Sequence, residues 1–417
     1  MLMNVMKKEL TLLWWTLIAL VIAFLCTHSP NLEYDTPSYI TFGMNRPPLY
    51  PFFIWLFHWA GRYQFLFIMW TQGGILLGAL YYARYWLRAR LHLTDVAIYM
   101  VFICTIFTIA MHYQINFIQA EGLAFPLFIA TFFLLVECFQ KFSLKKIGWL
   151  AFAVSVLILL RLQFYYLYFV FLLLSLWHCW QRVPIKQWML SVAILLSSML
   201  LTVFIDHTYH YFKHGFFGGA PYGGVLVMVQ TLYLADHTAE SAFQNSQEKA
   251  LMRRMLAKRD LLKLNQDVPL QNIMQPSALQ LAYQAYAKNY LALQAIITET
   301  LPADAIQAGR IAIEMDKMLI LHQPKQNILF FLWKYVKCMG GIPIFLFFLI
   351  LLLVGIYNMV SQAGSSAVGI FIGLSTSITF LNAATIAVCN PDLSMYFCYT
   401  QFLLYCLAAC VISHDFN

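Results

Sequence analysis

Long apolar runs separated by short polar segments dominate this sequence. Several runs approach the roughly 20 residues that an α-helix needs to cross the hydrocarbon core of a bilayer. Over the whole chain 61% of the residues are hydrophobic and 11% are charged, a composition far from that of a soluble domain. Backbone amides in lipid must be paired internally, and the alternating pattern of barrel strands is absent. The sequence therefore predicts an all-α polytopic membrane protein.

About ten transmembrane helices are predicted from the apolar runs. The stretch 147–180 is too long for one crossing and carries Arg161 in its middle, so it is divided into two spans with Arg161 at the turn. The predicted spans are 10–26, 65–83, 96–112, 122–139, 147–160, 162–180, 188–205, 342–360, 366–388 and 395–413.

Basic residues fix the expected orientation of these helices. One side of the predicted bundle collects four basic clusters, and by the positive-inside rule that side is cytoplasmic. Both termini then face the cytoplasm, and Arg46 and Arg62 lie on the opposite side. We expect the membrane to be a bacterial inner membrane, which makes that side periplasmic. The net charge of +8 does not form a basic stripe with interleaved aromatics, so it does not indicate nucleic-acid binding. The cytoplasmic residues are Lys7, Lys8, Arg84, Arg88, Arg90, Lys141, Lys145, Lys146, Arg182 and Lys186.

Three domains are expected. Residues 1–205 form an N-terminal membrane domain that includes an acidic first outer loop, 27–60, in which the proline-led segment from Pro47 reads as an interfacial helix. Residues 206–327 have an ordinary soluble composition and form a helical extracytoplasmic loop domain. Residues 328–417 form the C-terminal membrane helices.

Glu33 and Asp35 stand one residue apart in the first outer loop. A partly buried carboxylate suits a general base, and the neighbouring acid can orient it or share a metal ion with it. The alternative interpretation is that Asp35 caps a short helix beginning at Thr36, because Asp followed by proline in the first turn is a common helix start.

Three further charged residues are expected at the same outer interface. Arg46 can hold a phosphate or a lipid headgroup. Glu121 opens a predicted span, where a carboxylate marks a function by default, and Arg161 either pairs with it structurally or holds a phosphate. Two acids and two arginines together fit a site that moves a phosphate-linked group to a nucleophile, because the arginines hold the leaving phosphate and an acid receives the proton.

A second cluster follows the seventh predicted span, in the segment DHTYHYFKH. Asp206, His207, His210 and His214 have a spacing that metal ligands can adopt. A belt of His, Tyr and Lys where a helix leaves the membrane is the favoured interpretation.

The sequence resembles the GT-C superfamily of membrane glycosyltransferases, which includes protein O-mannosyltransferases and lipid A aminoarabinose transferases, by motif over roughly residues 1–180 and by topology alone over the rest. The resemblance is carried by Glu33-Tyr34-Asp35, Tyr39, the RPPLYP segment that begins at Arg46, Glu121 and Arg161. It implies inverting transfer of a sugar from a polyprenyl-phosphate donor to a lipid, glycan or protein acceptor on the periplasmic face.

The resemblance also implies roles for individual residues. Asp35 is the expected general base, with Glu33 and Glu121 as further catalytic acids, and Arg46 and Arg161 bind the donor phosphate. Tyr39, Tyr50 and Tyr396 are the expected substrate contacts. No cofactor is required by the sequence, and a divalent Mg or Mn ion on Glu33 and Asp35 is left open. Many relatives carry Arg-Tyr where this chain has Met395-Tyr396.

Three alternatives predict different behaviour. A polymerase or ligase acting on polyprenyl-diphosphate glycans needs basic residues in the large loop. A membrane transporter moves its substrate without a covalent product, although neither inverted repeats nor paired broken helices support it. A catalytically silent scaffold tolerates loss of Asp35.

Overall fold

The computed structural model describes residues 2–112, 115–265, 276–361, 366–391 and 393–415, and these residues are overwhelmingly helical. Within them the single extended pairing is a parallel bridge between Asn31 and Phe117. The chain divides into two compact units. The first comprises 1–217, 347–382 and 397–417, and the second comprises 218–346 and 383–396.

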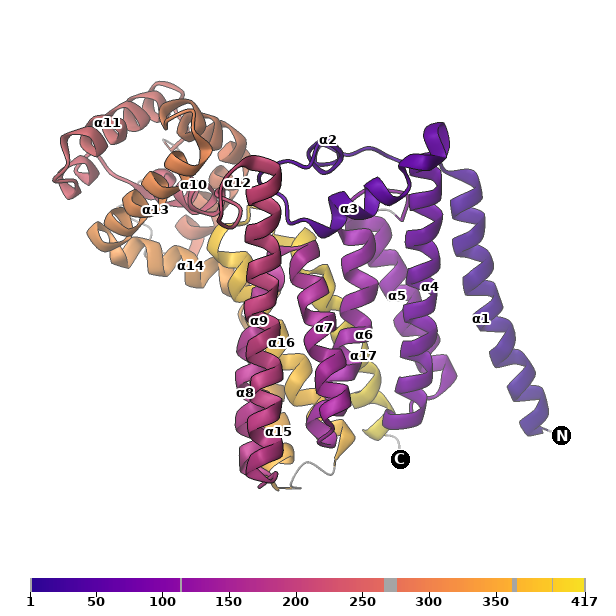
Figure 1. Cartoon of the computed structure of the whole chain (residues 1–417). Coiled ribbons are helices and arrows are strands. Elements are labelled where there is room, and N and C mark those ends of the chain that lie inside the picture. Colours follow the sequence, from indigo (N-terminus) through magenta and orange to yellow (C-terminus); the bar gives the residue numbers. More distant parts are fainter. Residues whose placement is uncertain (1, 113–114, 266–275, 362–365, 392, 416–417) are drawn as a thin grey trace. The chain divides into compact units, whose positions relative to one another are not determined.

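Long apolar helices build the first unit, and several of them run alongside one another (Figure 1). Each predicted span coincides with a helix, because an apolar segment of this length satisfies its backbone only as a helix. The helices are α1 (Leu2–Thr27), α4 (Gln64–Leu91), α5 (Asp95–His112), α6 (Glu121–Gln140), α7 (Leu144–Leu160), α8 (Leu167–Trp180) and α9 (Ile185–His214), with the greater part of α15 (Ile342–Ser361), α16 (Ala367–Cys389) and α17 (Leu393–Asp415).

Among the residues that the structure describes, six helical segments are long and apolar enough to cross a membrane. Shorter apolar segments occur in α1, α5 and α17. The all-helical class and several membrane-length helices are therefore confirmed, whereas the total of about ten spans stays a prediction. The six segments are His58–Leu91, Glu121–Gln140, Leu162–Trp180, Ile185–His214, Ile342–Ser361 and Ala367–Val388.

Helix α6 lies at the centre of the first unit. Its side chains are buried on nearly all faces, and Pro126 lies inside the helix among them. A helix that is apolar all round is expected to be buried by its neighbours. By contrast, α15 exposes most of its Leu, Ile and Phe side chains, as a lipid-facing helix does. Glu121 is the first residue of α6, so its position is fixed by the most buried of the six membrane-length segments.

The acidic first loop folds into α2 (Thr36–Ile40), α3 (Leu49–Leu56) and the 3₁₀ helix η1 (His58–Tyr63). These elements lie across one end of the long helices, which we call the α3 end (Figure 1). Pro48 occupies the N-cap of α3, where its missing N–H costs nothing. The exposed rings of Trp55 and Trp59 suit a membrane interface.

The second unit contains amphipathic helices around one apolar core. Buried Met, Leu and Tyr side chains of several helices form this core. The buried guanidinium of Arg259 donates to the carbonyls of Leu232 and Ala235, at 2.7 and 2.5 Å, and so satisfies the end of one helix. The elements are α10 (Gly223–Leu234), η3 (Ala239–Ala242), α11 (Ser246–Leu261), α12 (Pro276–Thr300), α13 (Ala305–His322) and α14 (Pro324–Cys338).

The two compact units begin and end at other residues than the expected domains, whose bounds at 206 and 327 stay a prediction. Helix α9 continues unbroken from its apolar part to His214, so residues 206–217 belong to the first unit. Helix α14 belongs to the second unit, where Phe330 joins the core. The composition changes at Asp206, but a helix has no reason to end where its composition changes unless a capping or breaking residue follows. Gly215, with φ +80°, is that residue.

Candidate functional site

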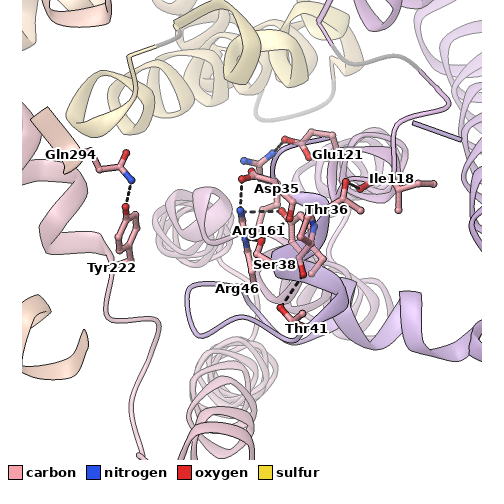
Figure 2. A network of polar contacts seen from close by, with 12 residues as sticks. Asp35, Thr36, Ser38, Thr41, Arg46, Ile118, Glu121, Arg161, Tyr222 and Gln294 are labelled. Atoms are coloured by element: carbon pink, nitrogen blue, oxygen red, sulfur yellow. Dashed lines mark hydrogen bonds and ion pairs between the residues drawn. The ribbon is translucent and has the colours of Figure 1, made fainter. Parts of the chain in front are cut away.

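The acidic first loop is bonded to the segment that leads into α6. The Asn31 N–H donates to the Asn116 carbonyl at 2.9 Å, and the Ile118 N–H donates to the Asn31 carbonyl at 3.0 Å. The Thr36 hydroxyl donates to the Ile118 carbonyl at 3.0 Å (Figure 2). Two segments far apart in sequence are thereby held in one arrangement, and the loop carrying Asp35 is fixed next to the chain that delivers Glu121.

Asp35 and Arg46 form an ion pair of 2.5 Å within this loop (Figure 2). Arg46 also donates from Nε to the Ser38 hydroxyl at 2.7 Å and from Nη1 to the Tyr39 hydroxyl at 3.3 Å. Its guanidinium carbon lies 4.5 Å from the centre of the Tyr39 ring. Asp35 occupies the N-cap position of α2 without a side-chain capping bond. The carboxylate is therefore directed to the arginine rather than to the helix.

Glu121 and Arg161 form a second ion pair (Figure 2). Arg161 has an extended backbone between α7 and the 3₁₀ helix η2 (Leu162–Tyr166). Its Nη1 also lies 3.5 Å from the hydroxyl of Tyr399 on α17. Glu121 is 5% exposed, so its charge is largely removed from water and requires this partner.

Tyr39 and Tyr50 pack against each other beside Arg46. Their ring centres are 4.9 Å apart in an edge-on arrangement, and Tyr50 is completely buried. Burial, together with the neighbouring Tyr39, raises the pKa of Tyr50 well above its ordinary value, against a smaller opposing effect from Gln72. Tyr50 therefore stays neutral and supports Tyr39. Contact of either ring with substrate stays a prediction.

Gln72, on α4, completes the support of the site and was not predicted. Its Nε2 donates to the Tyr50 hydroxyl at 3.2 Å and to the Gln119 carbonyl at 3.1 Å. A Cβ added at Gly122 would lie 1.9 Å from that nitrogen, so a larger residue there would displace the Gln72 amide. A lone glutamine in an apolar run was the available signal, because polar groups in membrane helices usually have a function.

The two ion pairs have the same electrostatic form. Each places a guanidinium against one carboxylate, and the nearer surroundings are aromatic rings and neutral hydroxyls. A phosphate has the charge and the oxygen geometry to replace a carboxylate on an arginine.

Two further predicted site residues are Glu33, which the structure describes, and Tyr396, whose side chain it does not. Glu33 is partly exposed and accepts a hydrogen bond of 3.0 Å from Asn31. The side chain of Tyr396 lies outside the described residues, as does Asp392. Tyr399, one turn further along α17, is the tyrosine that the structure brings to Arg161. Sequence reasoning missed it because many aromatic residues surround it in the same run.

A divalent ion is a poor fit to Glu33 and Asp35 as they are arranged. Asp35 Oδ1 faces the positive guanidinium of Arg46, and Glu33 Oε1 is bonded to an amide. Among the described residues, no group of three His, Cys, Asp or Glu side chains is placed to hold a metal. Asp206 and His210 do approach to 3.7 Å on α9, where His210 is stacked on Phe216. That environment is typical of an aromatic cluster.

No protein-family model, no curated protein and no solved structure matches this chain. A helical fold by itself does not specify a function, so any assignment must come from the residues of the site. The two arginine–carboxylate pairs are the chemistry available for that purpose.

Proposed function

We propose that this protein is an inverting membrane glycosyltransferase of the GT-C type. It transfers a sugar from a polyprenyl-phosphate carrier to a lipid, glycan or protein acceptor at the periplasmic face of a bacterial inner membrane. The observation that carries the proposal is the pair of arginines, Arg46 and Arg161, each held by a carboxylate on segments that are bonded together. The resemblance of the first loop to that superfamily agrees with it.

Donor binding follows from the exchange of anions on the arginines. The donor's phosphodiester carries one negative charge and replaces the Asp35 carboxylate on Arg46, which is the more exposed of the two pairs. Tyr39 and Ser38 keep the guanidinium in place while its partner changes. Asp35 is then free to accept a hydrogen bond from the acceptor hydroxyl.

Transfer proceeds in one displacement. The acceptor O–H bond breaks and its proton goes to Asp35, while the acceptor oxygen forms a bond to the anomeric carbon of the sugar. The bond between that carbon and the phosphate oxygen breaks, and its electron pair leaves with the polyprenyl phosphate. The leaving phosphate gains one negative charge, which Arg46 and Arg161 stabilise more strongly than the charge of the donor.

Glu121 and Tyr399 hold Arg161 in a fixed direction for this step. A charged group that is already oriented does not have to reorganise when charge develops, which is how fixed polar groups accelerate a reaction. Because Glu121 is buried, it acts through Arg161 and is a positioning residue in this mechanism. Glu33 lies beside Asp35 and adds to the negative potential of the loop. No step uses a metal.

The proposed orientation rests on charge and on the arrangement of the helices. Lys145 lies in the first turn of α7 and Arg88 in the last turn of α4, and the α3 segment precedes the opposite end of α4. The first turns of α1 and the last turns of α17 also lie away from that end in Figure 1. The positive-inside rule then places both termini in the cytoplasm and the α3 end in the periplasm. Reaction of single cysteines with a membrane-impermeant reagent, introduced at Trp59 or Lys145, tests this orientation.

The activity is tested with purified protein in lipid vesicles and a polyprenyl-phosphate donor carrying a radiolabelled sugar. We expect label in a membrane-glycan acceptor pool together with free polyprenyl phosphate. Movement of the donor between leaflets without covalent product would instead favour a transporter.

A further inference from the structure

An apolar groove lies among the helices at the end of the first unit away from the α3 end. It has a volume of about 350 Å³. Its walls come from α8, α15 and α16, together with Phe139 near the end of α6. The principal wall residues are Leu176, Trp177, Trp180, Ile356, Leu374 and Ser377. The walls are almost wholly hydrocarbon and aromatic, which suits an alkyl chain.

The ends of α6 and α8 are bonded together beside this groove. Trp177 Nε1 donates to the Phe139 carbonyl at 2.8 Å, and His178 Nε2 lies 3.0 Å from the Cys138 carbonyl. Carbonyls in the last turn of a helix otherwise lack partners. These ring bonds satisfy two of them and fix the wall residue Trp177 in place.

Two cations follow directly from these bonded helix ends. Lys141 is the first residue after α6, and Arg182 is the second residue after α8. Both side chains are exposed, and neither forms an ion pair with any residue in the described part of the chain. Lys146, close by, is by contrast neutralised by Glu137 at 2.6 Å. Lys141 and Arg182 each follow a groove-lining residue, Phe139 or Trp180, by two positions, so positive charge leaves the same helix ends that line the groove.

We propose that this groove binds one acyl chain of an anionic phospholipid whose phosphate lies against Lys141 and Arg182. An apolar chain fits the walls, and the two unpaired cations complement a negative headgroup. A zwitterionic lipid can fill the groove with an acyl chain, but its headgroup has no net charge to neutralise the two cations. The inference does not depend on glycosyl transfer, because it concerns the opposite end of the helices from Asp35 and Arg46.

The binding is tested by native mass spectrometry of the full chain, equilibrated with equimolar phosphatidylglycerol and phosphatidylcholine of identical acyl chains. We expect one phosphatidylglycerol to be retained in preference. Attraction of about 1 kcal/mol for each cation near the surface corresponds to about thirtyfold for the pair. Equal retention of the two lipids would overturn the proposal.

Two groups of variants locate the lipid. Leu176→Trp and, independently, Ser377→Met fill the groove, and each should reduce retention of phosphatidylglycerol at least about tenfold, since each buried methylene contributes roughly fourfold. Leu172→Trp is the matched control, because Leu172 is similarly exposed on α8 but does not line the groove. Retention unchanged in both groove variants would contradict the site.

The headgroup contact is tested with the double variant Lys141→Gln and Arg182→Gln. It should keep the bound lipid but lose the preference for phosphatidylglycerol, whereas Arg62→Gln, an exposed arginine of η1, should keep the preference. If the double variant still prefers phosphatidylglycerol, the lipid phosphate does not bind Lys141 and Arg182 as proposed. Displacement of phosphatidylglycerol by an equimolar amount of polyprenyl phosphate would identify the occupant as a prenyl chain and overturn the assignment.

Discussion

Arg161 and Glu121 are 40 residues apart in the sequence, and their side chains meet where α7 ends and α6 begins. Both charges are largely shielded from water, so neither is stable without the other. We expect Glu121→Gln and Arg161→Met each to lower the free energy of unfolding by about 3–5 kcal/mol, as removal of one partner of a buried pair does.

The double variant Glu121→Gln, Arg161→Met tests whether the pair acts as a unit. It should be markedly more stable than the sum of the single effects predicts, because no unpaired charge is left behind. Unfolding is measured in detergent micelles with a graded denaturant. Strictly additive effects would show that the two residues do not interact.

Arg46 should be more important for donor binding than for folding. Its guanidinium bonds at once to Asp35, Ser38 and Tyr39, and lysine does not reproduce that geometry. We expect Arg46→Lys to raise the KM for the polyprenyl-phosphate donor at least about tenfold, because the variant loses one charge-assisted hydrogen bond to the phosphate. Arg62→Lys, at an exposed position of η1, is the matched control. An unchanged donor KM in Arg46→Lys would remove this residue from the donor site.

Gly122 is predicted to be intolerant of a single methyl group. Alanine there forces the Gln72 amide away from Tyr50 and from the Gln119 carbonyl. We expect Gly122→Ala to lower the free energy of unfolding by about 1–3 kcal/mol. Gly148→Ala, also in a helix but with no atom within 4 Å of the added Cβ, should be neutral or stabilising. Equal behaviour of the two variants would show that the contact with Gln72 is unimportant.

Asp316 should make the stability of the second unit depend on pH. Its Oδ1 accepts a bond of 2.6 Å from Thr231, while Oδ2 has no hydrogen-bond partner within the described ranges. Burial raises its pKa from 3.8 to about 8. The folded state therefore retains a proton that the unfolded state has released, so stability is greatest below about pH 4 and declines as the pH rises to about 8.

The free energy of unfolding is measured at several pH values between 5 and 8.5. We expect it to fall by on the order of a few kcal/mol across this range in the wild type, and by much less in Asp316→Asn. Glu314→Gln, exposed on the same helix, should retain the wild-type slope. If the free energy of unfolding of Asp316→Asn still falls with pH as in the wild type, another group causes the pH dependence.

The helices of the first unit were predictable because hydropathy alone requires them. The position of Arg161 between two helices was also predictable. A guanidinium in the middle of an apolar run has to lie at the end of a helix or against a partner. The bonds among Asn31, Thr36 and Ile118 were not, because backbone pairing between distant loops has no periodic signal in the sequence. Gln72 was visible as an isolated polar residue, but its partners Tyr50 and Gln119 depend on packing.

The domain boundary was less predictable than the helices. Composition changes at Asp206, yet α9 ends only at Gly215, where a left-handed backbone terminates it. The pairing of Asp35 with Arg46 rather than with the start of α2 also follows from three-dimensional geometry, because both options are compatible with the sequence. Hydropathy determines where helices form, and polar contacts between loops decide which charged residues meet.

The most direct test of the proposed transfer compares purified wild type with Asp35→Asn in lipid vesicles, using a polyprenyl-phosphate donor with a labelled sugar. Asp95→Asn serves as the control, because it removes a carboxylate from Arg84 and Arg88 without touching the site. We expect product from wild type and Asp95→Asn, and a decrease of about 10²–10⁴-fold in Asp35→Asn with donor binding preserved. Product formation by Asp35→Asn at the wild-type rate would contradict the account.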